Sequence, residues 1–408
     1  MKILVINAGS SSIKYQLLDL EDVHRFTLLA SGLVEKITEP VGRITHKTHP
    51  GAPGETKVSE DRPFPSHREG LSRVVDLLCD PENGVIKDAA EIAGVGHRVL
   101  NCGEVYQNTV RVDAGVKATI REFFPLGPLH NPANLMGIEV AEEFFPSAVQ
   151  VAVFDTAFHG TMPPKAFLYA VPYEWYEKYR LRKYGFHGTS HKFIARAAQE
   201  FLGIPREETD IISLHLGNGC SMAAVRGGQC VDTSMGVTPL EGLVMGTRSG
   251  DIDATAVEYI AEKTGADVHQ MLVALNKKSG LKGICGVNDM REVVAAAESG
   301  NDRAALALDM FVYRIQKYIG SYLAVVPRLK ALVFTGGIGE NSDGVRARIF
   351  QGLEHLGLVL DPAKNAVRSS EPREIQAEGA KTKILVIPTN EELQIALETK
   401  AIIEGREI

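Results

Sequence analysis

Short apolar runs alternate along the chain with longer stretches whose apolar positions recur every three or four residues, an order typical of α/β proteins. Residues 2–6 predict a strand that ends in a turn of small residues at 7–12, and residues 13–17 alternate apolar and polar positions like a half-buried second strand. The same order of strand, small-residue turn and strand returns at 211–225. We therefore expect a duplicated fold with a cleft between its halves.

The remaining pattern adds a strand, two helices and an irregular segment. Residues 331–334 predict a short buried strand that runs into a glycine turn at 335–341, followed by a helix over 344–356. Before this strand, apolar residues from Leu306 to Leu323 recur at helical spacing and predict a long helix that Pro327 ends. Residues 40–65, rich in proline, glycine and charge, predict a loop or an irregular hairpin.

Composition excludes several classes of protein. The 408 residues suffice for two or three domains, and 44 Lys and Arg against 51 Asp and Glu give a net charge of −7. The basic residues are scattered singly, which argues against nucleic acid as the main partner. The longest apolar runs are far below the roughly 18 residues that span a membrane, and residues 3–6 are too short for the core of a signal peptide. We expect a cytoplasmic protein.

The five cysteines do not indicate a disulfide-bonded or zinc-binding protein. They include no C-x-x-C pair, which argues against a disulfide framework or a structural zinc site and indicates buried or half-buried thiols in a reducing compartment.

The turn at 7–12 is a candidate phosphate site. Its small residues let backbone N–H groups approach a phosphate, and Lys14 adds a positive charge just beyond. A tight hairpin with serine caps and a solvated lysine explains the same residues equally well. The chain lacks both the P-loop and the G-x-G-x-x-G signatures.

Two histidines stand where helices are expected to begin. His130 precedes an expected cap at Asn131, and His187 precedes an expected cap at Thr189 or Ser190. Helix N-termini attract anions, so both imidazoles could donate to a phosphoryl oxygen. The alternative for each is a histidine that fills a loop and bonds its own backbone.

Two arginines lie among small residues. Arg98 follows the apolar residues 92–95 at an expected strand end, and Arg248 lies in a segment rich in glycine. A guanidinium in such surroundings suits bidentate contact with a carboxylate or phosphoryl group. The pattern alone favours a structural ion pair for each, with Asp251 or Asp253 as the partner of Arg248.

Two acids have competing interpretations. Asp155 ends an expected buried strand at 149–154, where α/β sheets usually handle ligands and metals, although it could simply cap the next turn. Glu391 lies in the first turn of an expected helix, where Thr389 and Glu392 form a plausible capping box.

Taken together, the motifs closely resemble the acetate kinase family, and they run in family order along essentially the whole chain. They are residues 7–14, 97–99, 128–132, 154–159, 184–191, 215–219, 246–253 and 335–341. The resemblance implies the superfamily of sugar kinases, actin and chaperone ATPases: an α/β fold with two ribonuclease-H-like domains flanking a nucleotide cleft. We expect residues 1–154 with 391–408 as one domain and 155–390 as the other.

The resemblance also implies the reaction. Family members reversibly transfer a phosphoryl group from ATP to acetate, giving acetyl phosphate and ADP, with Mg²⁺ (or Mn²⁺), and they are homodimers. No nucleic acid or membrane partner is implied.

The resemblance assigns roles residue by residue. Asn7 and Glu391 match the metal-site residues, Arg98 the carboxylate-binding arginine, Asp155 the family's acid, His187 and Arg248 its transition-state stabilisers, and His130 a further active-site histidine. The nucleotide contacts match Lys14, His215, Leu216, Gly217, Asn218, Gly219, Asp289, Met290, Arg291, Gly337, Ile338, Gly339, Glu340 and Asn341. Because acetate is already an anion, we expect Asp155 to orient a group or hold a metal rather than to accept a proton.

One stretch departs from the family pattern. After residues 97–99 the family usually continues Val-His-Gly-Gly, whereas this chain continues with Leu100 and Asn101. Leu100 matches a wall of the methyl pocket, with Leu129 and Pro239 as the others, and its bulk predicts acetate over propionate, with butyrate poor. The alternatives are a propionate or other short-chain acyl kinase, and a non-catalytic nucleotide switch. A switch needs no carboxylate-binding arginine, which argues against it.

Overall fold

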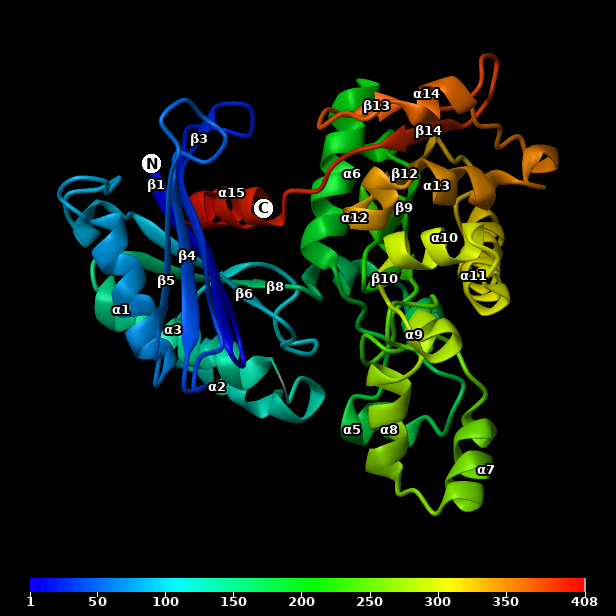
Figure 1. Cartoon of the computed structure of the whole chain (residues 1–408), viewed down its shortest axis with the longest axis horizontal. Coiled ribbons are helices and arrows are strands. Elements are labelled where there is room, and N and C mark those ends of the chain that lie inside the picture. Colours follow the sequence, from blue (N-terminus) through cyan, green and yellow to red (C-terminus); the bar gives the residue numbers. More distant parts are fainter. Residues whose placement is uncertain (129, 407–408) are drawn as a thin grey trace. The chain divides into compact units, whose positions relative to one another are not determined.

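The computed structural model describes residues 1–128 and 130–406. The chain divides into two compact units (Figure 1). Unit 1 comprises Met1–Phe158 with Asn390–Ile408, and unit 2 comprises His159–Thr389. The chain thus passes from one unit to the other after Phe158 and returns after Thr389, while the expected domain boundaries at 154 and 390 stay a prediction.

Unit 1 is built on a mixed sheet with the order β5-β4-β3-β2-β1-β6-β8-β7. Strands β1 to β5 pair antiparallel in sequence order, β6 and β8 run parallel to β1, and β7 closes the edge antiparallel to β8. The strands are β1 Lys2–Gly9, β2 Ser12–Leu20, β3 Phe26–Glu35, β4 Gly42–Thr48, β5 Thr56–Arg62, β6 Gly94–Val99, β7 Val110–Arg111 and β8 Val149–Phe154.

Helices cover both faces of this sheet, with α1 and α3 on one face and α15 on the other (Figure 1). Alternate residues of β1, among them Leu4 and Ile6, pack with α1 and α3 in the core. On β6, a side chain at Gly94 or Gly96 would collide with α15, so the two glycines let this helix lie close to the strand that carries Arg98. The helices are α1 His67–Leu78, α2 Ala114–Glu122, α3 Asn131–Phe144 and α15 Glu391–Ile403.

Unit 2 repeats the central topology of unit 1. Its sheet has the order β11-β10-β9-β12-β14-β13, in which β9, β10 and β11 pair antiparallel and β12 and β14 run parallel to β9. The run β11-β10-β9-β12-β14 therefore matches β3-β2-β1-β6-β8, which confirms the duplicated ribonuclease-H-like α/β fold. The strands are β9 Ile211–Leu216, β10 Cys220–Arg226, β11 Gln229–Thr233, β12 Ala331–Thr335, β13 Arg373–Glu374 and β14 Lys383–Val386.

The helices of unit 2 come before β9, between β11 and β12, and between β12 and β13 in the sequence. Helix α6 packs against β9 and β12, and the long α11 packs against β10 and β11. In the described part of the chain, none of the helices combines the length and the apolar character that a membrane span requires. The helices are α4 Pro164–Phe167, α5 Glu174–Tyr179, α6 Gly188–Leu202, α7 Ala254–Thr264, α8 Val268–Lys277, α9 Gly280–Cys285, α10 Met290–Glu298, α11 Asp302–Val325, α12 Gly336–Asn341, α13 Asp343–Phe350 and α14 Pro362–Ala366.

Several sequence predictions are confirmed. The strands expected at 149–154, 211–216 and 331–334 are β8, β9 and β12, and the long helix that Pro327 was expected to end is α11. Two of its apolar positions, Leu306 and Met310, are nevertheless exposed. All five cysteines are free thiols, buried or half-buried.

Three segments differ from the prediction. The turn expected at 7–12 is shorter, because small residues at 8 and 9 extend β1 and pair with β2, which places Asn7 opposite Lys14. Residues 40–65 contain the regular hairpin β4–β5 rather than a loop or an irregular hairpin. The helix expected over 344–356 ends at Phe350, since Gly352 adopts a φ of 84°, which a helix does not continue through.

Two helix caps also differ. Helix α3 begins one residue early, with His130 as its cap, because the Asn131 amide is buried and donates to the Asn101 carbonyl oxygen at 2.8 Å. The capping box expected at Thr389 is wrong, and Asn390 caps α15 with its side chain. Both predicted caps use their side chains in tertiary contacts, which local sequence does not reveal.

Candidate active site

The predicted acceptor residues of unit 1 form a buried ion pair. Arg98 lies at the end of strand β6, as predicted, and Asp155 directly follows the neighbouring strand β8. Arg98 Nη2 donates to Asp155 Oδ2 at 2.9 Å; the Asp155 side chain is 1% exposed and that of Arg98 is 25% exposed. Asp155 raises the pKa of Arg98 above its usual value. Because one N–H of the fork serves Asp155, the exposed part of the guanidinium can bind a further anion.

Glu391 lies in the electrostatic field of this pair. It is the first residue of α15, and burial raises the pKa of its carboxyl to about 6, while Arg98 lowers it and Asp155 and Glu392 raise it. A half-buried acid among other acids is stabilised by a cation. The structure therefore brings three predicted site residues, Arg98, Asp155 and Glu391, into one interacting group.

The donor set fits a hard divalent cation. Carboxylates at Glu391 and Asp155 and the amide oxygen of the half-buried Asn7 on β1 offer the oxygen ligands that Mg²⁺ prefers. Among the described residues no three His, Cys, Asp or Glu side chains gather as a ready metal cage.

Lys14 belongs to the same end of unit 1. It lies on β2 opposite Asn7, its side chain is 53% exposed, and it forms an ion pair with Glu392 on α15. The second acid of α15 is thus paired with a lysine.

In unit 2, His187 is held in an uncommon backbone conformation. It caps α6 with φ 56° and ψ 25°, so Thr189 and Ser190, the predicted caps, lie inside the first turn instead. Histidine is among the few residues that adopt this left-handed region more often than average, and such strain gathers at functional sites. The preceding carbonyl, of Phe186, accepts a hydrogen bond from His159 Nε2 at 2.9 Å, which fixes the peptide that orients His187.

The ring of His187 lies against that of His215, the penultimate residue of β9. Their centroids are 4.2 Å apart and the planes are 25° apart. His215 Nδ1 is hydrogen-bonded to Ser190 Oγ at 2.8 Å. The hydroxyl expected to cap α6 therefore positions a predicted nucleotide residue.

Arg248 approaches His187 at the glycine turn between β9 and β10. A Cβ placed on Gly219 would lie 3.5 Å from both Arg248 Nη1 and His187 Cε1. Arg248 Nη1 donates to the Pro239 carbonyl oxygen at 3.1 Å and lies 3.7 Å from Met245 Sδ. The two predicted transition-state residues thus converge on a position where a side chain is missing.

The predicted ion-pair alternative for Arg248 is wrong. Asp251 pairs with Arg314 and accepts from the Tyr318 hydroxyl, and Asp253 caps α7. Within residues 1–128 and 130–406, Arg248 has no carboxylate partner, and burial lowers its pKa. A partly buried cation without a counter-charge is a site for an anionic ligand.

The predicted nucleotide segments meet around the same turn. The Asn218 carbonyl accepts from the Gly246 N–H at 2.9 Å, and its side chain accepts from Asn288, next to residues 289–291. Gly336, with φ 77°, lets α12 start where a Cβ would lie 2.8 Å from the Leu216 carbonyl oxygen. Segments far apart in sequence are thus brought together in unit 2.

Some of the residues predicted to contact the nucleotide are instead hydrogen-bonded or ion-paired to nearby residues of unit 2. Glu340 Oε1 accepts from the Gly336 and Thr389 N–H groups at 2.8 and 3.1 Å, so this carboxylate caps α12 and fixes the segment that leads out of unit 2. Met290 is buried, and Arg291, with a highly exposed side chain, pairs with Asp289.

The predicted methyl-pocket residues are divided between the units. Leu100 is half-buried in unit 1 beside Gly127, and its N–H donates to Asn134 Oδ1 at 3.0 Å. Pro239 lies in unit 2, and Leu129 lies outside the described residues. Asn134, which also donates to the Ala8 carbonyl, was missed; its position one turn after His130 on α3 was the available signal.

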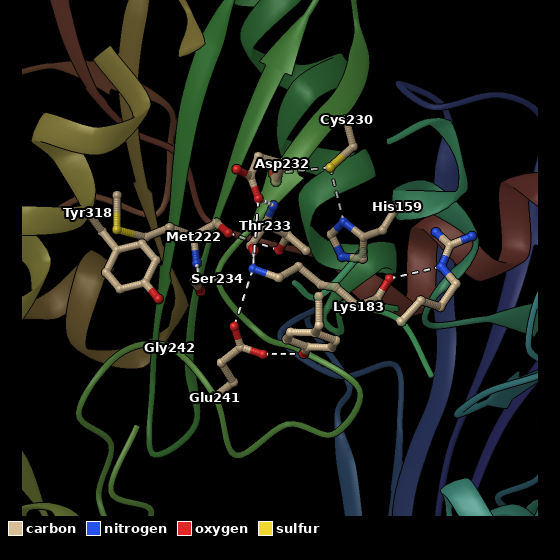
Figure 2. Close-up of polar contacts among 12 residues, drawn as sticks. His159, Lys183, Met222, Cys230, Asp232, Thr233, Ser234, Glu241, Gly242 and Tyr318 are labelled. Atoms are coloured by element: carbon tan, nitrogen blue, oxygen red, sulfur yellow. Dashed lines mark hydrogen bonds and ion pairs between the residues drawn. The ribbon is translucent and has the colours of Figure 1, made fainter. Parts of the chain in front are cut away.

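A second missed group surrounds Lys183 (Figure 2). Its ammonium donates to the Thr233 carbonyl at 3.0 Å and lies between Glu241 and Asp232 at 3.5 and 3.9 Å. The Tyr169 hydroxyl donates to Glu241. These contacts hold the segment that carries Pro239, the carbonyl partner of Arg248.

A duplicated ribonuclease-H-like fold that carries Arg248 and His187 beside a glycine turn, and Arg98 on a buried acid, suits an enzyme of phosphoryl transfer such as a kinase. The profile of the Acetokinase family matches residues 2–397. An acetate kinase of Nitratidesulfovibrio vulgaris (strain DP4) is 56% identical over 405 residues, covering 99% of this chain and 100% of that protein. The chain therefore belongs to the acetokinase family.

Solved structures agree with this assignment. The acetate kinase of Porphyromonas gingivalis superposes with a TM-score of 0.93 at 41% identity, covering 98% of this chain and 99% of that one. A propionate kinase from Francisella tularensis gives a TM-score of 0.90 at 42% identity, with the same coverage.

Proposed function

We propose that this chain catalyses the reversible transfer of a phosphoryl group between ATP and acetate, giving ADP and acetyl phosphate. The observation that carries the proposal is Arg248, a partly buried cation that meets His187 at Gly219 and has no carboxylate partner among the described residues. The many relatives that are named acetate kinases support the same reaction.

In this proposal the residues of unit 1 bind the phosphoryl acceptor, acetate. Arg98 binds the acetate carboxylate with the donors that Asp155 leaves available, and Asp155 keeps the guanidinium charged and oriented. Because acetate is already ionised at neutral pH, the forward reaction needs no general base. Asp155 therefore acts as an orienting and metal-site group.

In this proposal the residues of unit 2 stabilise the phosphoryl group during transfer. Phosphoryl transfer needs in-line placement and neutralisation of charge on the equatorial oxygens more than covalent work by the protein. His187 and Arg248 donate to these oxygens as the group loosens from its leaving oxygen. We assign His130, the exposed cap of α3, as a further donor to the phosphoryl group.

Mg²⁺, or Mn²⁺ in its place, is the proposed metal, held by Asn7 and Glu391. When bound, it would neutralise charge on the nucleotide phosphates. Burial raises the pKa of Glu391, and a bound cation would stabilise the charged carboxylate, which supports this assignment.

The proposed nucleotide contacts are the backbone around the β9–β10 turn and α12, with Lys14 as a positive charge for a phosphate. Glycines at 217, 219, 337 and 339 let a nucleotide approach the backbone closely. Asn218 and Asn341 offer side-chain amides, and the short helix α12 begins at a glycine.

The protein is further proposed to be a homodimer of the cytoplasm. Helix α11 exposes Leu306, Met310 and Tyr313 at helical spacing, and α7 has no buried residue, which suits coverage by a second copy. The free thiols and the use of ATP suit a reducing compartment. Light scattering after size exclusion tests the dimer, and Tyr313→Glu is expected to give monomers.

A propionate kinase is the alternative, and the Francisella structure shows that this fold serves such an enzyme. Leu100 favours acetate, because a leucine at the pocket wall leaves less room for a longer acyl chain than a valine does. Comparing kcat/KM for acetate, propionate and butyrate separates the two.

The primary test is a hydroxamate assay for acyl phosphate with ATP, Mg²⁺ and acetate. The proposal expects acetyl hydroxamate in proportion to ADP formed, and none when acetate is left out. Nucleotide binding without any acyl phosphate would instead identify a nucleotide switch.

A further inference from the structure

A chain of hydrogen bonds leads from the interior of unit 2 to His187. Ser221, on β10, is fully buried, and its Oγ contacts His187 Nδ1 at 2.9 Å and His191 Nε2 at 2.8 Å. His191 Nδ1 in turn contacts Ser213 Oγ on β9 at 2.8 Å. Ser213, His191 and Ser221 are all 0% exposed, so solvent does not compete for these bonds.

The number of protons available limits which way the hydrogen bonds between Ser213 and His187 can point. Burial and the neighbouring histidines lower the pKa of His191 well below its usual value, so its ring is neutral and carries a single N–H. Each serine hydroxyl likewise carries a single proton. The buried Ser221 hydroxyl contacts only His187 and His191 among the described residues, so its proton needs one of them as acceptor. The donors therefore all point toward a neutral His187 or all point away from it.

The two directions give His187 opposite properties. If the protons point toward it, Ser213 donates to His191, His191 Nε2–H donates to Ser221, and Ser221 donates to His187 Nδ1. A neutral His187 then carries its proton on Nε2, the nitrogen that would lie 3.6 Å from a Cβ on Gly219. If they point away, this nitrogen has a lone pair and repels a phosphoryl oxygen, which only accepts.

We propose that Ser221 is a positioning residue for His187, and that it donates to Nδ1 so that a neutral His187 presents Nε2–H to the transferred phosphoryl group. The inference deepens the proposed function and rests on it. His191 acts one bond further away by supplying the proton that forces Ser221 to donate outward. The strained backbone of His187 agrees with a side chain whose orientation is fixed from several directions.

The test compares two buried serines. Ser221→Ala is expected to lower kcat about tenfold or more, as the loss of outer partners that orient a functional imidazole does, with KM for ATP and acetate little changed. Ser234→Ala is the matched control: Ser234 is equally buried and accepts from the Met222 N–H, but it touches no histidine in the structure described. It should keep kcat within about twofold, as removal of one neutral hydrogen bond affects only stability.

Two further measurements separate positioning from folding. In a His187→Ala background, Ser221→Ala should lower kcat by less than about twofold, because groups that act as a unit are not additive. Nitrogen-15 NMR of histidine-labelled wild-type protein should show His187 protonated on Nε2, with the resonance assigned by its loss in His187→Ala. This measurement needs neither a folded Ser221 variant nor activity.

A His187 ring protonated on Nδ1 would overturn the inference, and so would full additivity of the two substitutions. If His187→Ala is as active as wild type, the proposed role of His187 fails instead. If His187→Ala is inactive while Ser221→Ala is fully active, the reaction stands and only the positioning role of Ser221 is lost.

Discussion

The polar groups of the two units differ in how they balance charge. In unit 1 both cations of the candidate site have an acidic partner: Arg98 pairs with the buried Asp155, and Lys14 pairs with Glu392. In unit 2, Arg248 contacts only a carbonyl oxygen and a thioether among the described residues. One group is largely neutralised by the protein itself, while the other keeps a positive charge for its ligand.

The difference follows from what each group is proposed to bind. An acetate carboxylate needs a guanidinium of fixed orientation, and a buried acid supplies that orientation. A phosphoryl group in transfer spreads negative charge over several oxygens, and fixed cations and N–H donors stabilise that charge best when no internal anion competes. We therefore expect that removing Arg98 from unit 1 mainly lowers the free energy of unfolding, whereas removing Arg248 from unit 2 mainly lowers kcat.

The largest effect is expected for Arg248→Ala. We expect kcat to fall by on the order of 10³ or more, as for other arginines at phosphoryl transition states. The free energy of unfolding should change by less than about 1 kcal/mol, because no buried carboxylate loses its partner. Acyl-phosphate assays and urea titrations measure the two quantities; Arg196→Ala, which removes an exposed pair with Glu200, is the control. An enzyme that keeps most of its activity would remove Arg248 from the mechanism.

In Arg98→Ala we expect a large loss of folding stability, in contrast to Arg248→Ala, in which mainly kcat should fall. Breaking a buried pair removes the guanidinium that pairs with the Asp155 carboxylate, so the free energy of unfolding should fall by about 3 kcal/mol or more, and KM for acetate should rise. Adding Asp155→Asn should restore part of the stability but not the acetate affinity. Urea unfolding and acetate titrations measure both; if Arg98→Ala were as stable as Arg248→Ala, the contrast between the units would fail.

Acid should destabilise unit 1 through its buried histidines. Burial lowers the pKa of His46 and of His97 from 6.5 to about 4. Above pH 6.5 both are neutral in the folded and unfolded chain; as pH falls from 6.5 to 4, only the unfolded chain takes up protons, so stability is lost. Each shift corresponds to on the order of 3 kcal/mol.

Urea midpoints between pH 7.5 and 4.5 measure this loss. His97→Gln should flatten the pH dependence, since one group fewer binds a proton on unfolding, whereas replacing the exposed His355 serves as the control. Equal slopes for wild type and His97→Gln would show that another group dominates.

The smallest effect is expected at the acyl pocket. Leu100→Val should raise the ratio of kcat/KM for propionate to that for acetate by about tenfold, the discrimination that one methylene in an apolar pocket provides. Leu306→Val, the same chemical change on the exposed face of α11, should leave the ratio unchanged. An unchanged ratio in Leu100→Val would place the limiting wall elsewhere.

Local signals in the sequence were enough for the main strands and for α11, because their apolar runs and spacing are properties of neighbouring residues. The caps of α3, α6 and α15 were misplaced for the opposite reason. Asn131, Ser190 and Thr389 are good capping residues by type, yet each uses its side chain on a distant partner. Asn134 and Ser221 were missed because each acts through contacts with other elements rather than through a local motif.

By itself, the sequence determined the α/β class, the duplicated strand pattern and, through motifs in family order, the kinase family and the candidate functional residues. Only the tertiary structure decided which charged groups and hydrogen-bond partners those residues contact. Arg98 forms an ion pair with Asp155, Arg248 has no acidic partner among the described residues, and His187 is hydrogen-bonded to Ser221. The physical reason is that propensity and periodicity act between near neighbours, whereas charge pairing and hydrogen bonding depend on which distant strands the sheet brings together.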